Sequence, residues 1–395
     1  MKFRVPYSRP YIGDADVAAV SAVLLSGSIA AGEYVEQFES EVAKFVNSSD
    51  AVAFSSATAA LHSVFAYYAG KAIGDDTPVV LVPDITFTAT ANAAIAAGLE
   101  VELVDVDAET GFVDGETVKQ ACARIREKNP SKEILLVLVF IAGHVYDLTD
   151  ISELVKDYGV HVIEDASHAF GSRYRSGEPV GSCKYAECSI FSSHAVKCFT
   201  TGEGGTVVAN DTSLIEFVRL FRSHGIVRPS ESKTPWNYDQ PSFGLNYRMT
   251  DFAAALGLSQ LSAYTDFRKR RLDVVENFYI PLFESAEIRM IGMSVIQESS
   301  NHLCIGRLKN LTREDRDEYI CSARAKGIEL NFHYPPLHQL TFHSERVFHR
   351  HPGAECSNSL SFSSQIVSFP LFVGMSSDHL RGISDFIINS RGSRL

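Results

Sequence analysis

The chain has 395 residues, 45% hydrophobic and 21% charged, which is typical of a globular protein with one large domain or two smaller ones. Its net charge of −12 argues against a nucleic-acid-binding protein, which would normally carry a basic face. The sequence shows no signal-peptide pattern and no stretch of roughly 18 apolar residues that could span a membrane. Its seven scattered cysteines, without a CxxC pair, indicate reduced thiols. We therefore expect a cytoplasmic protein without a membrane partner.

The first predicted element is a helix, DADVAAVSAVLLSG, with Asp14 as its cap and Gly27 at its end. Short β-branched runs then alternate with helical patterns, which is typical of a mostly parallel sheet covered by helices on both faces. The strands are nearly continuous apolar runs, as expected for strands buried on both sides. The predicted strands are residues 51–56, 79–83, 101–106, 134–140, 161–165, 187–193 and 205–210.

The pattern changes in the second half of the chain. Residues 227–243 are rich in Pro and Ser, contain the only tryptophan, Trp236, and predict a long surface loop. A helix follows from about Thr250, and from about residue 266 the elements become fewer and more separated. We predict a large α/β domain over 1–265 and a smaller α+β domain over 266–395. The histidines between His333 and His351 fit no common metal-binding spacing, so no metal site is expected there.

Polar groups follow several of the predicted strands, where ligands bind in open α/β sheets. The first strand leads into Ser56-Ala57-Thr58 at a helix start, and the second leads to Phe87. Asp165 ends the fifth strand, and the sixth leads through Ser192 to Lys197. A helix N-terminus suits a phosphate, a lysine can form a Schiff base with an aldehyde, and a carboxylate can pair with a pyridinium nitrogen. An aromatic ring can stack on such a cofactor. The combination favours a pyridoxal phosphate (PLP) enzyme.

Each residue taken singly has a simpler interpretation. Lys197 could be a strand-end lysine whose stem packs on apolar groups, and Asp165 could cap the next helix. Phe87 could belong to the core, and Ser56-Ala57-Thr58 could be an ordinary helix start. The stretch GEGG at 202–205 is not a dinucleotide fingerprint, and SSATAA lacks the Gly-rich turn of an NAD(P)-dependent enzyme. The hypothesis rests on the joint placement of these residues at neighbouring strand ends.

Longer stretches resemble the DegT/DnrJ/EryC1/StrS family of PLP-dependent nucleotide-sugar aminotransferases, which have the aspartate aminotransferase-like fold type I. The resemblance covers nearly the whole chain and rests on these segments: GEYVEQFESEVAKF (32–45), SSATAALHS (55–63), PDITFTATANA (83–93), VIEDASHAFGS (162–172), FSSHAVKCFTTGEGG (191–205), RSHGI (222–226), GLNYRMTDFAAALGLSQL (244–261), SSNHLC (299–304) and HYPPLH (333–338).

The resemblance implies a role for each matching residue. Lys197 would form the Schiff base and carry the proton, and Asp165 would pair with the pyridine nitrogen. Phe87 would stack on the cofactor ring, and His168, where the family often has glutamine, would lie near the ring oxygen. The residues that would hold the phosphate are Ala57, Thr58 and Ser192, with Asn246 reaching the cofactor of the other subunit. That last role implies a homodimer with shared active sites.

Three positions depart from the family pattern. Ala57 replaces the glycine of SGT, Ser193 replaces the phenylalanine of SFH, and Leu245 replaces the tyrosine of GYNYRM. None of these changes removes a reacting group. A dehydratase branch of the family has histidine in place of the lysine, so Lys197 favours transamination over elimination.

Within the family, the stretches YSRP, DASHAFGS, FSSHAVK, FRSHGI and SSNHL most resemble enzymes of pseudaminic acid biosynthesis. That resemblance implies a UDP-linked 2-acetamido-2,6-dideoxy-4-hexulose as substrate and glutamate as amino donor, with ping-pong kinetics. Tyr7, His333 and Tyr334 are candidate substrate contacts, or packing residues at the domain junction. The alternatives are a sister aminotransferase for a GDP-perosamine-type or 3-keto dTDP-sugar, and a PLP-binding regulatory protein without turnover.

Overall fold

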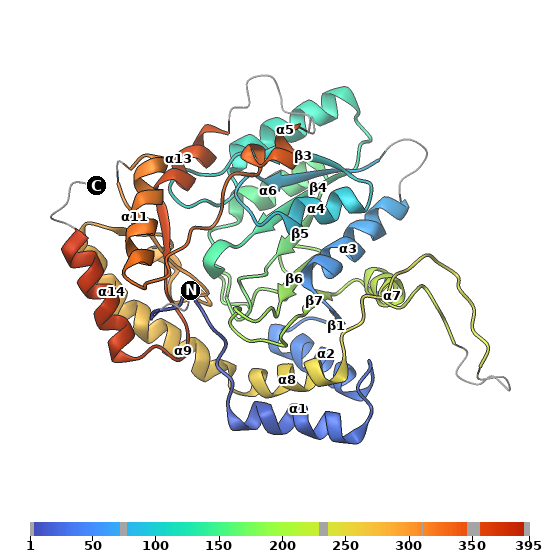
Figure 1. The fold of residues 1–395 in the computed structure, drawn as a ribbon. Coiled ribbons are helices and arrows are strands. Elements are labelled where there is room, and N and C mark those ends of the chain that lie inside the picture. Colours follow the sequence, from blue (N-terminus) through green and yellow to red (C-terminus); the bar gives the residue numbers. More distant parts are fainter. Residues whose placement is uncertain (1–3, 72–76, 229–235, 310, 346–355, 391–395) are drawn as a thin grey trace.

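The computed structural model describes residues 4–71, 77–228, 236–309, 311–345 and 356–390. The larger part of the fold is a seven-stranded sheet in the order β1-β7-β6-β5-β4-β2-β3 (Figure 1). All its neighbouring strands pair in parallel except β7, which is antiparallel to β1 and β6. Its strands are β1 (Asp50–Phe54), β2 (Val79–Pro83), β3 (Glu100–Val104), β4 (Ile134–Val139), β5 (Val160–Asp165), β6 (Cys188–Ser192) and β7 (Gly205–Ala209).

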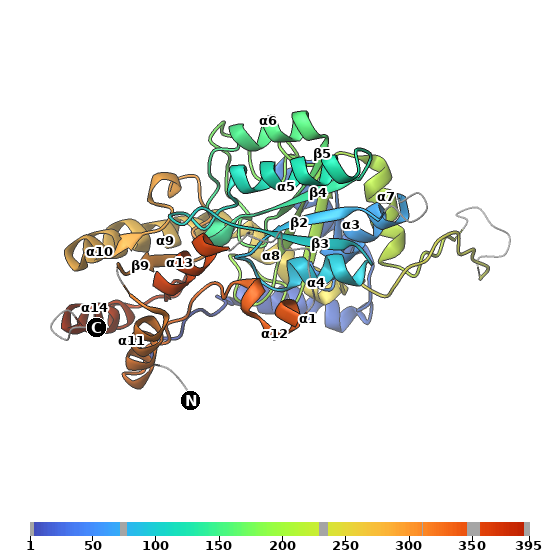
Figure 2. The same ribbon diagram turned by 90° about the horizontal axis from the view of Figure 1, so that it is seen from above.

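Helices cover both faces of this sheet, as predicted. One apolar core lies between the sheet and α2 (Glu33–Val46), α5 (Gly115–Lys128), α6 (Thr149–Tyr158) and α8 (Asp251–Ser262). A second core lies between the opposite face and α3 (Ala57–Lys71), α4 (Ala89–Ala96) and α7 (Thr212–Phe221). Figure 2 shows α5 and α6 on one side of the strands and α4 on the other. Burial on both faces explains why these strands are almost uninterrupted apolar runs.

The cap residue of the first helix, α1 (Asp14–Ser26), lies one position earlier than expected. Gly13 occupies the cap position, and the carboxylate of Asp16 accepts the Gly13 N–H at 2.9 Å, so the prediction of Asp14 as cap is wrong. Gly27 ends the helix in the left-handed conformation at φ 78°, as predicted. Among the described residues, no helix combines the length and apolarity that crossing a membrane requires.

The C-terminal part contains a smaller antiparallel sheet in the order β10-β9-β8. Its core also takes in Val5, which forms a parallel bridge with Ile328, so the start of the chain packs against this part. The domain boundary between residues 265 and 266 remains a prediction. The elements here are α9 (Tyr264–Val274), a π-helical turn (Val275–Tyr279), α10 (Ile280–Ala286), β8 (Arg289–Met290), β9 (Cys304–Arg307), α11 (Arg313–Ala325), α12 (Thr341–Glu345), α13 (Ser357–Gln365), β10 (Ile366–Phe369) and α14 (Ser377–Ser390), with 3-10 turns at Ile141–Gly143, Met293–Val295 and Leu337–Gln339.

Candidate active site

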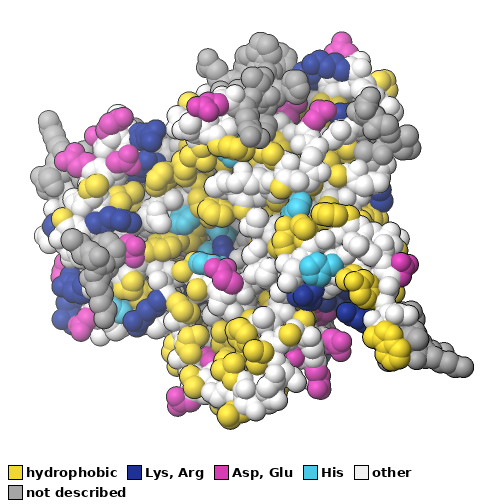
Figure 3. Space-filling model, turned by 45° about the vertical axis from the view of Figure 1, so that its right-hand side comes forward, with side chains coloured by type: hydrophobic (Ala, Val, Ile, Leu, Met, Phe, Trp, Pro, Cys, Tyr) yellow, Lys and Arg dark blue, Asp and Glu magenta, His cyan; other side chains and the backbone are white. Residues whose placement is uncertain are grey.

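A cavity of about 470 Å³ lies at the carboxyl ends of the central strands, beside the C-terminal part. It brings together Lys197, Asp165, Ala57, Thr58, Phe87, His168, Ser192, Tyr7, His333 and Tyr334. Figure 3 shows histidine side chains gathered in a hollow at the centre of one face of the molecule. Among the predicted site residues, only Asn246 does not line this cavity. The structure therefore joins residues from nearly the full length of the chain.

Lys197 lies in the connection between β6 and β7, which pair as an antiparallel hairpin. The connection is closed by hydrogen bonds from Ser193 N–H to Gly204 O (3.0 Å) and from Thr201 N–H to Ser193 O (2.9 Å). The Lys197 amide donates to His194 O at 2.9 Å, which fixes the backbone where the side chain leaves it. Burial lowers the pKa of Lys197 to about 8, against the opposing effects of Asp165 and Cys198. A lysine in this state can be a base and a nucleophile near neutral pH.

Asp165 ends β5 and is 6% exposed. Its Oδ2 accepts a hydrogen bond from the Thr90 hydroxyl at 2.7 Å, and its Oδ1 accepts from the Ser167 amide at 3.2 Å. No helix follows in the described stretch 166–187, so the alternative interpretation of Asp165 as a helix cap is wrong. The carboxylate is held by two donors and faces the cavity that Lys197 also lines.

The N-terminus of α3 opens onto the same cavity through Ala57 and Thr58. Ser56 caps this helix, because its hydroxyl accepts the Ala59 N–H at 3.1 Å. The amides of Ala57 and Thr58 belong to the first helical turn, where N–H groups have no intrahelical acceptor. Gly205 lets β7 pass directly beneath them: a Cβ there would lie 2.3 Å from the Ala57 nitrogen. A helix N-terminus with free amides is a binding site for an anion such as phosphate.

The opposite wall of the cavity comes from the two ends of the chain. The Tyr7 hydroxyl lies 3.2 Å from Nε2 of His333, and the His333 Nδ1 lies 2.8 Å from the Ser368 hydroxyl. Burial and the nearby Lys197 lower the pKa of His333 to about 3, so its imidazole is neutral. Tyr334 follows directly, with its ring centroid 5.8 Å from that of Phe87, which is 56% exposed at the cavity mouth. The exposure of Phe87 removes the alternative that it is a core residue.

His302 and Thr90 belong to this site, and neither was singled out from the sequence. His302 lines the cavity with its ring centroid 4.5 Å from that of His168, and it is 4% exposed. The run SSNH, which places four polar residues before an apolar strand, is the signal that could have pointed to it. Thr90 lies four positions after Thr86, and its contact with Asp165 spans 75 positions of sequence.

The segments that carry Phe87 and Tyr334 are tied together behind the cavity. The His338 amide donates to Asp84 Oδ1 at 2.9 Å, and Nδ1 of His338 lies 2.6 Å from Oδ2 of the same carboxylate. With Cys356 these two residues form a group of potential metal ligands within 4.8 Å of one another. The direct contact between Asp84 and His338 fixes one cavity wall relative to the other. His349 and His351 lie outside the described residues.

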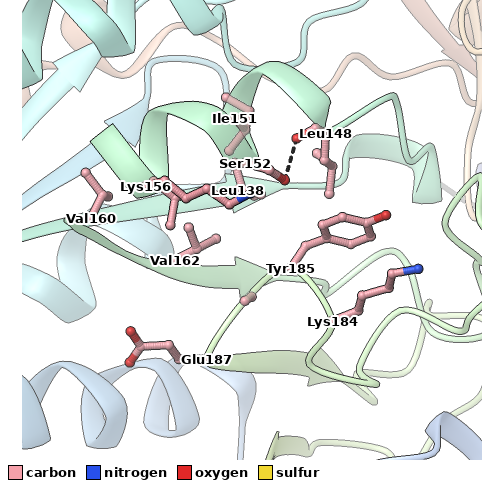
Figure 4. A pocket seen from close by; sticks show the side chains of 12 residues that line it. Leu138, Leu148, Ile151, Ser152, Lys156, Val160, Val162, Lys184, Tyr185 and Glu187 are labelled. Carbon is pink, nitrogen blue, oxygen red and sulfur yellow. Dashed lines mark hydrogen bonds between the residues drawn. The ribbon is translucent and has the colours of Figure 1, made fainter. Parts of the chain in front are cut away.

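A second cavity, of about 440 Å³, lies between α6 and the segment that leads into β6 (Figure 4). Apolar side chains such as Leu138, Ile151 and Val162 line it, with Lys156 and Glu187 among them. It contains none of the predicted site residues, so the chemistry belongs to the first cavity.

These residues fit PLP. The cavity offers a lysine that burial favours as the free amine, a carboxylate held by two donors, and a helix N-terminus that lines it at Ala57 and Thr58. A PLP enzyme needs these three groups for the aldehyde, the pyridine nitrogen and the phosphate. Side-chain hydroxyls and one exposed aromatic ring complete the lining.

Comparisons with known proteins agree with this interpretation. Residues 10–387 match the model of the DegT/DnrJ/EryC1/StrS aminotransferase family. A UDP-4-amino-4,6-dideoxy-N-acetyl-beta-L-altrosamine transaminase of Campylobacter jejuni is 34% identical over 342 residues, which are 86% of each chain. The Bacillus subtilis spore coat polysaccharide biosynthesis protein SpsC is 29% identical and covers 97% of this chain and 96% of its own length.

Solved structures show the same fold. Helicobacter pylori PseC, an aminotransferase involved in the biosynthesis of pseudoaminic acid, superimposes over 100% of both chains with a TM-score of 0.87 and 26% identity. The sugar aminotransferase Spr1654 of Streptococcus pneumoniae, solved in PLP and PMP forms, superimposes with a TM-score of 0.86 and 27% identity over 98% of this chain. The predictions of the fold, of PLP as cofactor and of aminotransferase activity are confirmed. The chain belongs to the DegT/DnrJ/EryC1/StrS aminotransferase family.

Proposed function

We propose that this enzyme transfers an amino group from glutamate to C4 of a UDP-linked 4-keto-6-deoxy-N-acetylhexosamine, in a pathway of the pseudaminic acid type. The observation that carries the reaction is the placement of Lys197 and Asp165 in one cavity, with the lysine pKa lowered to about 8. The substrate class is supported by the printed activity of the Campylobacter jejuni relative at 34% identity.

PLP supplies an aldehyde that exchanges amino groups and a ring that withdraws electrons from the reacting carbon. In our proposal the Ala57 and Thr58 amides and the Ser192 hydroxyl hold its phosphate. Phe87 packs on the face of the ring, and Asp165 keeps the ring nitrogen protonated. The hydrogen bonds from Thr90 and Ser167 orient this carboxylate before any ligand binds.

Lys197 carries the proton in both halves of the proposed cycle. With glutamate bound, Nζ of Lys197 would take the proton from the α-carbon. The amino group would stay on the cofactor, water would supply the new carbonyl oxygen, and 2-oxoglutarate would leave. With the keto-sugar bound, the same nitrogen delivers a proton to the sugar C4. Both steps need a lysine that changes protonation state near neutral pH, which a pKa of about 8 provides and an ordinary surface lysine does not.

The neutral wall of Tyr7, His333 and Tyr334 suits the sugar. Burial keeps the His333 ring uncharged and raises the pKa values of both tyrosine hydroxyls, so all three present hydrogen-bonding groups without charge. Sugar hydroxyl and carbonyl oxygens are recognised by such groups, because an unpaired charge would cost desolvation energy. We assign Tyr7, His333 and Tyr334 to sugar recognition.

We further propose that the enzyme is a homodimer with shared active sites. Asn246 is exposed and lies outside the cavity of its own chain, as expected for a residue that serves a partner's cofactor. Apolar side chains are exposed on α1 and α8, among them Val17, Leu24, Leu25 and Phe252, and Figure 3 shows such side chains on the lower part of the face that carries the hollow. An exposed apolar surface of this kind marks a protein interface.

The experiment that tests the substrate is a spectral titration of the PLP-loaded enzyme. Glutamate should convert the visible absorbance band of bound PLP to that of the amine form. A UDP-linked 4-keto-6-deoxy-N-acetylhexosamine should then restore it, while a GDP-4-keto-sugar and a 3-keto dTDP-sugar should not. Restoration by one of the other sugars would contradict the proposed substrate, and no response to glutamate would contradict the proposed amino donor.

A further inference from the structure

Both ring nitrogens of His168 are already engaged by the protein. The amide of Ala142 donates a hydrogen bond to Nδ1 at 3.3 Å, and Nε2 lies 3.1 Å from the Tyr334 hydroxyl. Because a backbone N–H can only donate, Nδ1 must be the unprotonated nitrogen of the ring. Burial and the nearby Lys197 lower the pKa of His168 well below its usual value, so the ring is neutral and carries its one proton on Nε2.

This assignment fixes the direction of the next hydrogen bond. His168 Nε2–H donates, so the oxygen of Tyr334 accepts. Burial raises the pKa of Tyr334, and the hydroxyl keeps its own proton. In the described part of the chain, the Tyr334 hydroxyl makes no second hydrogen bond, and Tyr334 lines the cavity together with Lys197 and Asp165. The proton of Tyr334 is therefore available to a ligand in the cavity.

The surroundings hold this arrangement rigidly. Ala142 adopts a left-handed backbone conformation at φ 61°, which is unusual for a residue with a Cβ and marks a segment held by its neighbours. Its carbonyl accepts the His302 amide at 2.9 Å, and the Ser300 hydroxyl donates to the His168 carbonyl at 2.6 Å. Three chain segments thus fix the imidazole before substrate arrives.

We propose that Tyr334 donates a hydrogen bond to the keto oxygen of the sugar, and that His168 is the positioning residue that sets the direction of this bond. The inference rests on the proposed function, since that function supplies a ketone as ligand. A neutral donor aimed at a carbonyl oxygen polarises the C=O bond toward attack by an amine, and it leaves no buried charge unpaired when the site is empty.

Substitutions at position 168 separate this role from a purely structural one. In His168→Gln the amide oxygen can accept from Ala142 and the amide nitrogen can donate to Tyr334, so the direction is kept. In His168→Glu the carboxylate can only accept hydrogen bonds. The Tyr334 hydroxyl then donates to it, so the direction of the bond is reversed and this proton no longer faces the ligand. Tyr334→Phe removes the donor itself.

The readout is the infrared stretch of a ¹³C-labelled C4 carbonyl, measured with the keto-sugar bound to the PLP form, where no amine is available for transfer. The wild type and His168→Gln should show the same lowered frequency. Tyr334→Phe and His168→Glu should both shift it upward and reduce kcat/KM for the sugar about tenfold, the size expected for one neutral hydrogen bond. Thermal unfolding and the PLP absorbance band identify any variant that fails to fold or to bind PLP.

The double variant His168→Glu/Tyr334→Phe tests whether the effect of His168 depends on Tyr334. If His168 acts through Tyr334, the double variant should be no worse than Tyr334→Phe alone. Additive losses, or one carbonyl frequency across all the proteins, would overturn the inference. A wild-type enzyme that never aminates this sugar would instead overturn the proposed function.

Discussion

Thr90 donates a hydrogen bond from its hydroxyl to Oδ2 of Asp165 at 2.7 Å, and the Thr86 hydroxyl lies 2.9 Å from that of Thr90. These two hydrogen bonds join the start of α4 to the end of β5 at the cavity, which Thr86 and Asp165 line. It orients the Asp165 carboxylate, which we assign to the pyridine nitrogen of PLP.

Thr90→Val should therefore weaken PLP binding about tenfold or more, because a hydrogen bond to a charged group contributes about 1.5–3 kcal/mol. The dissociation constant of PLP, measured by titrating the apoprotein, checks this. Thr88→Val is the matched control, because Thr88 lies in the same segment and, among the described residues, its hydroxyl accepts only from the side-chain amide of Asn92. Equal PLP affinity in wild type and Thr90→Val would show that Asp165 needs no such support.

Gly205 is required for the close passage of β7 beneath α3. Gly205→Ala would place a Cβ 2.3 Å from the Ala57 nitrogen, so the helix N-terminus must move and PLP binding should be lost. Gly70→Ala, in the same helix, meets no atom within 4 Å and should stabilise the protein by about 0.5–1 kcal/mol. Thermal unfolding and PLP titration of both variants check the pair. A Gly205→Ala protein with normal PLP affinity would contradict the phosphate site.

The buried Glu164 should make stability depend on pH. Burial raises its pKa to about 7, against the hydrogen bonds from Ser189 and Tyr174. The folded state therefore binds this proton more tightly than the unfolded state, whose carboxyl titrates near 4.5. The stabilisation is complete below that value and is lost as pH rises toward 7, by on the order of 3 kcal/mol.

Glu164→Gln should remove this pH dependence, since its amide can bond to both hydroxyls without a charge. Denaturant unfolding between pH 4.5 and 8 measures the effect. The variant should be more stable than the wild type at pH 8, and parallel curves for the two proteins would contradict the assignment.

Shared active sites predict complementation between inactive subunits. Lys197→Ala and Asn246→Ala proteins should each lose activity as homodimers. In a mixed dimer, one site combines the intact Lys197 of one subunit with the intact Asn246 of the other, so random mixing should restore about a quarter of wild-type activity. Mixing after mild denaturation and refolding checks this. No recovery, despite mixed dimers being present by mass spectrometry, would place Asn246 outside the partner's site.

Much of this site follows from local sequence. Every predicted strand of the large sheet is present, with ends shifted by at most two residues, because runs such as ILLVLV are buried on both faces. Parallel strands end at a common edge, so Asp165, Ala57 and Phe87 could be placed near one another from their positions after strands. Lys197 joins them through the β6–β7 hairpin.

Long-range contacts carry no such local signal. Tyr7 meets His333 across 326 positions, and His302 reaches His168 only because the C-terminal part docks on the sheet. The interpretation of Asp165 as a helix cap is wrong because no helix follows it in the described stretch 166–187, and its carboxylate accepts from the distant Thr90 and from the neighbouring Ser167. The direction of the His168–Tyr334 bond depends on the Ala142 amide, whose orientation no residue pattern reports.

The central claim is that Lys197 is the residue that bonds to PLP. Borohydride reduction of the PLP-loaded enzyme fixes the cofactor to its lysine, and mass spectrometry of the digested protein then locates the modified residue. The account predicts that the pyridoxyl group is found on Lys197 and that Lys197→Ala takes up none at any position. A pyridoxyl group on a different lysine of the wild-type protein would contradict the account.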